Sequence, residues 1–106
     1  DARRLALMKP HAWLVNVARG AHVDTDALVA ALEARSIGGA ALDVTEPEPL
    51  PEGHPLWGMD NALITSHVAN TWDMALPELR AMVERNVSAF AAGRELEGLV
   101  DIDLGY

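Results

Sequence analysis

Three polar residues, Arg19, Asp43 and His67, each come just after a short apolar run of the sequence. An arginine guanidinium keeps its charge at any ordinary pH and can grip a carboxylate with two hydrogen bonds. A histidine imidazole exchanges protons near neutral pH and can act as a general acid or base. Each residue also has an ordinary structural interpretation: a surface ion pair for Arg19, a turn cap for Asp43 and a hydrogen-bonded loop residue for His67. The catalytic interpretation requires that the three residues meet in the fold.

The apolar runs predict three strands separated by a helix and a loop. We expect strands at residues 12–17, 40–42 and 62–65, because nearly continuous apolar runs are typical of parallel strands covered on both faces. An opening helix should end at Lys9-Pro10, and a second should run from an N-cap at Asp24 to about Arg35. Residues 45–61 hold four prolines and two glycines, so a long loop without regular structure is expected there.

A long helix should follow the third strand and end near Gly93. Its apolar stripe would consist of Leu79, Met82, Val83, Val87 and Phe90. Residues 70–71, Asn-Thr, are a candidate capping pair, but Pro77 leaves two alternatives. Either the helix begins near Leu76 with Pro77 in its first turn, or it begins earlier with kinked first turns. The tail, residues 99–106, has no strong pattern.

This order of elements is that of half of a doubly wound α/β sheet. In that architecture ligands bind beyond the carboxyl ends of the strands, so Arg19, Asp43 and His67 should converge on one crevice. A chain of 106 residues can build one modest core. A half sheet leaves a strand edge and part of its apolar faces uncovered, so we expect the isolated chain to self-associate.

The composition excludes several classes of protein. Sixteen acidic residues against eight basic ones give a net charge of −8, which argues against a nucleic-acid partner. Without cysteine there is no disulfide, thiolate metal site or thiol nucleophile, and we predict no metal. No run approaches the roughly 18 apolar residues that a membrane span requires. We therefore expect a cytoplasmic protein that acts on a small molecule.

Several short motifs follow one another along the chain in a characteristic order and spacing. They are Met8-Lys9-Pro10, Asn16-Val17-Ala18-Arg19-Gly20, Ala40-Ala41-Leu42-Asp43-Val44 with Glu48-Pro49, His54-Pro55-Leu56-Trp57, and His67-Val68-Ala69. No single motif is specific, but together they resemble the D-isomer-specific 2-hydroxyacid dehydrogenase family, of the glyoxylate/hydroxypyruvate reductase or phosphoglycerate dehydrogenase type. The resemblance covers essentially the whole chain.

The resemblance implies hydride transfer between a nicotinamide cofactor, NAD or NADP, and C2 of a small 2-keto or 2-hydroxy acid. It makes Arg19 the residue that binds the substrate carboxylate and His67 the general acid/base. Glu48 would hydrogen-bond His67 and stabilise its charged form. Glu46 has the same chemistry, but the family's spacing of five residues from Asp43 selects Glu48.

The cofactor-binding residues that the resemblance implies are Val17, Ala18, Arg19, Asp43, His67 and Asn70. Asp43 would accept a hydrogen bond from the nicotinamide carboxamide, with the backbone of Val17 and Ala18 close to the ring. Two positions depart from the family pattern: Asn70 stands where glycine is most common, and Thr45 where phenylalanine is common. Both leave the substrate preference and the cofactor fit open.

The resemblance also divides the chain into parts of a larger fold. Residues 1–70 would be the second half of a Rossmann-type NAD(P)-binding domain, and residues 71–106 the interdomain helix and C-terminal tail of the substrate domain. The family's Gly-x-Gly-x-x-Gly loop, which binds the pyrophosphate, does not occur in the sequence, and the first residues read as a helix entered midway. We therefore expect a truncated or proteolysed chain, inactive alone, whose intact protein is a homodimer.

Two other functions remain open. Transcriptional corepressors that sense NAD(H) resemble the same family and keep the same residues. An independent small α/β module without a cofactor is the blander alternative. The remaining histidines, His11, His22 and His54, are interpreted as ordinary loop residues.

Overall fold

The computed structural model describes residues 1–104, so the last two residues of the predicted tail, Gly105 and Tyr106, lie outside the described residues. The chain folds as two compact units, the first comprising residues 1–69 and the second beginning at Asn70. Within residues 1–104, no helix combines the length and the apolar character needed to cross a lipid bilayer.

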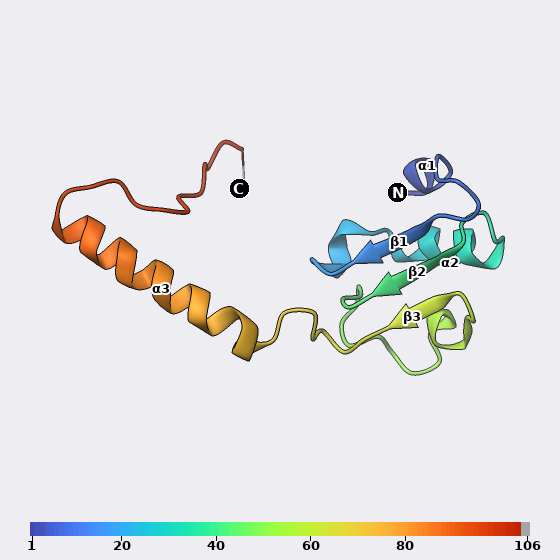
Figure 1. Ribbon diagram of the computed structural model, residues 1–106. Helices are drawn as coiled ribbons and strands as arrows, with labels where there is room; N and C mark the ends of the chain where they lie inside the picture. The colour runs from blue at the N-terminus through green and yellow to red at the C-terminus, as the bar shows by residue number, and fades with distance from the viewer. Residues whose placement is uncertain (105–106) are drawn as a thin grey trace. The chain divides into compact units, whose positions relative to one another are not determined.

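The first unit is built on a parallel sheet (Figure 1). Its strands are β1 (Trp13–Asn16), β2 (Gly39–Leu42) and β3 (Ala62–Ile64), hydrogen-bonded in the order β1-β2-β3. Its helices are α1 (Ala2–Leu5), α2 (Thr25–Glu33) and two 3₁₀ helices, η1 (Gly20–His22) and η2 (Pro55–Gly58). The predicted α/β class and the parallel pairing are confirmed, and all three strands end at the same edge of the sheet.

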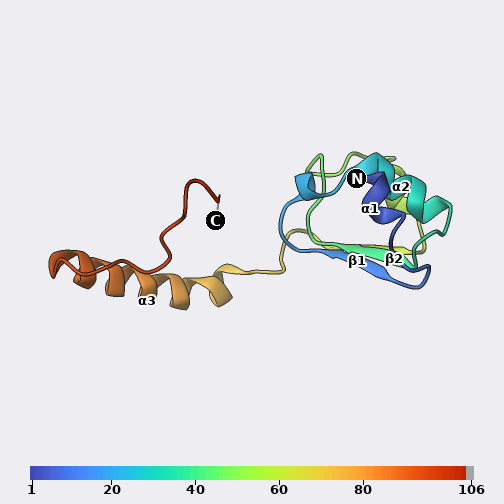
Figure 2. The same ribbon diagram turned by 90° about the horizontal axis from the view of Figure 1, so that it is seen from above.

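One face of the sheet packs against the helices to form the core. Figure 2 shows α1 and α2 on the same side of the strands. The helices contribute Leu5, Leu28 and Leu32, which cluster with Ala40 and Leu42 of β2. The predicted N-cap of α2 is present, because Asp24 Oδ1 accepts a hydrogen bond from the amide of Ala27 at 3.0 Å. This cap fixes where the helix that covers the sheet begins.

The loop between β2 and β3 is more ordered than the sequence predicted. Its prolines and glycines suggested no regular structure, but η2 forms within it. Pro55 occupies the first turn, where its missing N–H costs nothing, and His54 Nδ1 accepts from the amide of Leu56 at 3.3 Å. Leu56 is buried in the core, so this turn closes the loop against the sheet.

The opposite face of the sheet is exposed within residues 1–69. Alternate residues of β1 point away from the helices, and Val15 pairs across the sheet with Ala41 and then Leu63. Val15 is 66% exposed and Leu63 58% exposed, and Trp13 on the same side of β1 is half exposed. The apolar runs predicted strands covered on both faces, but residues 1–69 supply a layer for one face only. We call this exposed surface, formed by Trp13, Val15 and Leu63, the open face.

An exposed apolar face of this kind should make the isolated chain self-associate. We expect a second copy to cover the open face, because removing apolar surface from water stabilises the contact by roughly 25 cal/mol per Å². Placing charges there, in a Val15→Glu/Leu63→Glu variant, should weaken association at least about tenfold, as one desolvated charge costs more than 1.4 kcal/mol. Leu7→Glu, which alters an exposed leucine just beyond the end of α1, is the matched control. Sedimentation equilibrium measures the change, and a monomeric parent chain would contradict the prediction.

The second unit is a long helix followed by an irregular tail. α3 (Trp72–Ala91) begins after Thr71 and contains Pro77 in its interior, so the alternative in which the helix begins near Leu76 is wrong. Its end is as predicted: Gly93 has φ = 65°, a conformation that glycine adopts without steric cost. In the tail beyond Gly93, the backbone of Glu97 forms two hydrogen bonds, of 2.8 and 3.0 Å, with the side chain of Asn86 in α3. These bonds fold the tail back along its helix.

Candidate active site

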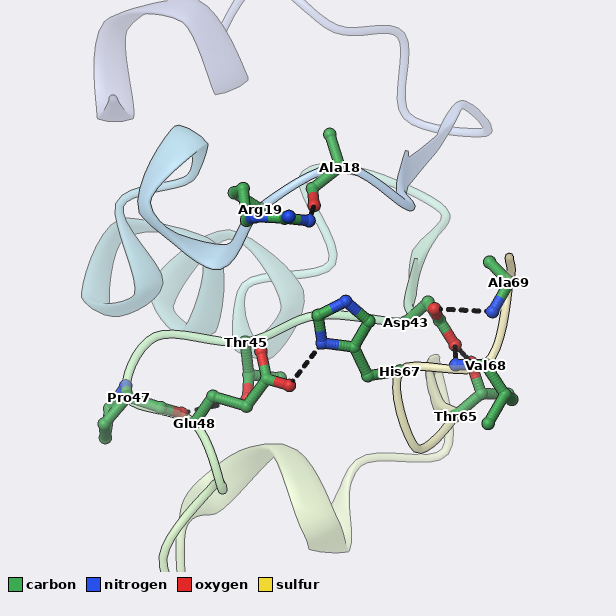
Figure 3. A network of polar contacts seen from close by, with 10 residues as sticks. All are labelled: Ala18, Arg19, Asp43, Thr45, Pro47, Glu48, Thr65, His67, Val68 and Ala69. Carbon is green, nitrogen blue, oxygen red and sulfur yellow. Dashed lines mark hydrogen bonds and ion pairs between the residues drawn. The ribbon is translucent and has the colours of Figure 1, made fainter. Parts of the chain in front are cut away.

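His67 lies in the turn that follows β3. Its φ of 57° places it in the left-handed region, which residues other than glycine occupy rarely and at some cost. The two residues after it explain why this conformation persists. The amides of Val68 and Ala69 donate to Asp43 Oδ1 and Oδ2, at 2.9 and 2.8 Å (Figure 3). The turn is therefore fixed to the carboxyl end of the neighbouring strand.

Asp43 is buried and its carboxylate is largely used within the protein. Besides the two amides, the hydroxyl of Thr65 donates to Oδ1 at 2.6 Å. A carboxylate offers about four acceptor positions, so these three bonds leave one on Oδ2. The hydrogen bond from Thr65, followed by those from Ala69 and Val68, lowers the pKa of Asp43 below its ordinary value of 3.8, with a smaller contribution from His67. Asp43 is thus held as an anion.

The lowered pKa of Asp43 predicts a loss of stability in acid. Because the folded pKa lies below the unfolded one, folding favours the ionised form. The resulting stability is complete above about pH 4 and is lost as the pH falls through the folded pKa. Urea unfolding between about pH 7 and pH 2 should show this loss, and Asp43→Asn should reduce it while lowering stability at neutral pH. Asp103→Asn, at an exposed position, should leave the profile unchanged; an unaltered profile in Asp43→Asn would count against the assignment.

The side chains of Glu48 and His67 are in hydrogen-bond contact. Oε1 of Glu48 lies 2.7 Å from Nδ1 of His67, and the two side chains are 41% and 47% exposed. A carboxylate accepts only, so Nδ1 carries the proton in this contact and Nε2 is left for other partners. In Figure 3, Nε2 points toward the turn that holds Ala18 and Arg19. Glu46, the other acidic residue of this loop, is exposed, and it is its backbone carbonyl that is used, accepting from Thr25.

Arg19 lies in the turn that follows β1, and Asn16 organises this turn. Asn16 is buried; its amide Nδ2 donates to the carbonyl of Arg19 at 2.9 Å, and its Oδ1 accepts from the amide of Ala18 at 3.1 Å. The guanidinium of Arg19 is exposed and donates from Nη1 to the carbonyl of Ala18 at 2.7 Å. The amide of Ala18 therefore already donates to Asn16. The predicted contact of the Ala18 backbone with the cofactor ring stays a prediction.

The Arg19 turn and the Glu48 loop are in contact. Gly20 packs so closely on Thr45 that a Cβ at position 20 would lie 2.0 Å from the carbonyl oxygen of Thr45. Only glycine can occupy this position without moving one of the two segments. Arg19, Glu48 and His67 thus lie at the same carboxyl edge of the sheet, on segments that contact each other. A pocket of about 220 Å³ at this edge is lined by Asp43, Glu48 and His67 but not by Arg19, so the predicted meeting of Asp43 and His67 is present and that of Arg19 with them stays a prediction.

A groove of about 240 Å³ lies on the open face, next to this edge. It is lined by Val15, Val17, Ala41, Leu42, Asp43, Leu63, Thr65, Val68 and Ala69. The lining is mostly aliphatic, and Asp43 and Thr65 are its polar residues. Such a surface fits a flat heteroaromatic ring that carries one hydrogen-bond donor. Of the other predicted cofactor contacts, Asn70 begins the second unit, so its contact remains a prediction.

Two residues that organise the site were not singled out from the sequence. Asn16 lies within one of the motifs, and a polar residue inside an otherwise apolar strand is a signal that its side chain has a partner. In the sequence, Thr65 shows only as the end of the third apolar run. Its bond to Asp43 joins residues 22 apart, which no local pattern reveals.

Comparison with protein families gives one match to the first unit. Residues 1–69 match the family described as "D-isomer specific 2-hydroxyacid dehydrogenase, NAD binding domain". A glyoxylate reductase of Thermofilum pendens is 45% identical over 101 residues, which are 95% of this chain and 30% of that protein. A glyoxylate/hydroxypyruvate reductase A of Yersinia enterocolitica is 42% identical over 100 residues, 93% of this chain and 31% of that protein. The chain thus spans about a third of the length of these relatives.

Solved structures show the same fold. A D-isomer-specific 2-hydroxyacid dehydrogenase from Xanthobacter autotrophicus, determined with NADPH, superposes with a TM-score of 0.86 at 44% identity, covering 100% of this chain and 43% of that one. An NADPH-dependent glyoxylate/hydroxypyruvate reductase from Sinorhizobium meliloti, determined with NADP, gives a TM-score of 0.86 at 32% identity, covering 100% of this chain and 34% of that one. The Rossmann-type sheet predicted from the sequence is confirmed.

Proposed function

Since the chain belongs to the D-isomer-specific 2-hydroxyacid dehydrogenase family, we propose that it supplies the reacting residues of an NAD(P)-dependent reductase of small 2-keto acids. Glyoxylate and hydroxypyruvate are the substrates we favour, because the two relatives described above are named glyoxylate reductase and glyoxylate/hydroxypyruvate reductase. The observation that supports this most is the contact between Glu48 and His67 at the sheet edge that also holds Arg19. A general acid with a charge partner and a cation for a carboxylate are what this reduction requires.

Each residue has a distinct part in the proposed reaction. The bound nicotinamide supplies the hydride. The exposed guanidinium of Arg19 binds the substrate carboxylate and so places the carbonyl carbon. Nε2 of His67 donates a proton to the carbonyl oxygen in reduction and removes the hydroxyl proton in oxidation. Glu48, on Nδ1, holds the ring in one orientation and stabilises its protonated form.

The groove beside Asp43 is the proposed place of the nicotinamide ring. Its aliphatic walls suit the ring, and the remaining acceptor position on Asp43 Oδ2 suits the carboxamide NH₂. The superposed structures were determined with NADPH and with NADP, and we therefore include both NADPH and NADH as coenzymes.

We further propose that the chain works together with residues beyond these 106. It spans about a third of its relatives, and its sequence holds no glycine-rich pyrophosphate loop. In this proposal residues 1–70 complete a cofactor domain, residues 71–106 belong to the substrate domain, and the complete protein is a homodimer.

The test is turnover by the complete protein that contains this chain. We expect oxidation of NADPH or NADH with glyoxylate or hydroxypyruvate at an ordinary rate, about 1–10³ s⁻¹, and no turnover by the purified 106-residue chain. Robust turnover by the 106 residues alone would overturn the proposal that further residues are needed. Tight NADH binding by the complete protein without turnover of any 2-keto acid would instead favour the NAD(H)-sensing alternative.

A further inference from the structure

The carboxylate that faces His67 is carried by a loop that belongs to no helix or strand. Residues 46–49 are all exposed, and the side chain of Glu48 is 41% exposed. A glutamate has three rotatable bonds, and on a mobile backbone its carboxylate would sample many positions. A contact of 2.7 Å with Nδ1 therefore requires that the backbone at residue 48 be fixed by something else.

Thr45 provides such a restraint. It is buried, 9% exposed, and its hydroxyl donates to the carbonyl of Pro47 at 2.9 Å (Figure 3). That carbonyl belongs to the peptide group that joins Pro47 to Glu48. A threonine hydroxyl bonded to the backbone two residues along stabilises a local turn. The bond therefore sets the orientation of the peptide from which the Glu48 side chain departs.

Thr45 is itself held on its other side. Its carbonyl oxygen lies against Gly20, with no room for a Cβ between them. The next residue, Glu46, is fixed as well. The hydroxyl of Thr25, the first residue of α2, donates to the carbonyl of Glu46 at 2.7 Å. A restraint that is anchored to both the Arg19 turn and the covering helix can hold Glu48 relative to the rest of the site.

We propose that Thr45 is a positioning residue of the site, whose hydroxyl fixes the backbone of Glu48 so that its carboxylate meets Nδ1 of His67. The inference rests on the proposed function, because the contact between Glu48 and His67 matters only if His67 transfers a proton. Thr45 touches neither substrate nor cofactor in this role. A side chain without a hydroxyl at this position could not donate the bond, so the restraint depends on the threonine that this chain has.

The proton position on the His67 ring reports the contact without any cofactor. A neutral imidazole donating to Glu48 carries its proton on Nδ1, and without that bond the proton is free to move to Nε2. Long-range ¹⁵N NMR of the ring nitrogens in the 106-residue chain at about pH 9, well above the ordinary titration range of imidazole, distinguishes the two forms. General loss of stability does not change this ratio as long as the chain is folded.

Thr45→Val removes the hydroxyl at nearly constant volume, and Thr45→Ser retains it. We expect Thr45→Val to lower the ratio of the Nδ1–H to the Nε2–H form by about threefold or more, the size of one side-chain hydrogen bond, and Thr45→Ser to keep the parent ratio. Thr45→Ala should behave like Thr45→Val and replaces it if that variant does not fold. Thr71→Val is the control, because Thr71 precedes α3 without a side-chain capping bond.

The outcomes separate the inference from the proposed function. If Glu48→Leu, which has no acceptor for Nδ1–H, and the parent chain have the same ratio, Glu48 does not hold His67, and the proposed pair fails with everything that rests on it. If Glu48→Leu lowers the ratio but Thr45→Val and Thr45→Ala do not, the pair stands and the role of Thr45 is wrong. If Thr45→Ser falls as far as Thr45→Val, the methyl group and not the hydroxyl is responsible, and the proposal is again overturned.

Discussion

Replacing His67 with asparagine should lower kcat of the complete protein by a factor of about 10²–10⁴, the usual contribution of a positioned general acid. Asparagine tolerates the left-handed backbone that His67 adopts, so the turn should survive the change. The loss should appear in kcat and in kcat/KM alike, because the proton is transferred only in the transition state. Glu48→Gln, which keeps the histidine and removes its charge partner, should cost less, about 10–100-fold.

The control for this prediction is a histidine outside the site. His22 is the exposed last residue of the 3₁₀ helix η1, so His22→Asn should retain parent kinetics. Steady-state kinetics with NADPH and glyoxylate measures all three variants, and circular dichroism checks their fold. Parent-like kcat in His67→Asn would remove His67 from the reaction, and with it the proposed mechanism.

Replacing Arg19 with methionine should lower kcat/KM for the keto acid by about 100-fold. Two charge-assisted hydrogen bonds to the substrate carboxylate at about 1.5 kcal/mol each amount to about 3 kcal/mol. Arg19→Lys should lie between the parent and Arg19→Met, because lysine keeps the charge but cannot form the paired contact. The affinity for NADPH, measured by its fluorescence without substrate, separates a loss of substrate binding from a loss of coenzyme binding in both variants.

Arg35→Met is the matched control for Arg19. Arg35 forms a surface ion pair with Asp60 at 2.9 Å, so its loss alters the same residue type at a position away from the sheet edge. Exposed ion pairs contribute about 0–1 kcal/mol, and no change in kcat/KM is expected. Equal losses in Arg19→Met and Arg35→Met would show that a general charge effect is at work, and Arg19 would then have no specific role.

The sequence predicted those parts of the fold that depend on local patterns. The cap at Asp24 and the end of the long helix at Gly93 follow from the preferences of single residue types, and both are present. The three strands follow from apolar runs of ordinary strand length. At the site, the positions of Arg19 and His67 follow from topology, since parallel strands end at the same edge of a sheet.

What could not be predicted depends on contacts between distant residues or on competing local terms. The bonds that fix the His67 turn join Asp43 to residues 22–26 positions away. The start of the long helix was left open because Pro77 removes one hydrogen bond and crowds the preceding turn, while the helix continues to Ala91 beyond it. The open face of the sheet was anticipated from the half-sheet topology and not from the strand pattern, which suggested cover on both sides.

The groove beside Asp43 shares Val15 and Leu63 with the open face of the sheet. A second copy docked on that face and a nicotinamide ring in the groove would therefore exclude one another. By mass action, each would weaken the other's apparent binding by the same factor. The apparent dissociation constant of the dinucleotide would then depend on the concentration of the chain. The intrinsic constant would be obtained by extrapolating titrations to low protein concentration.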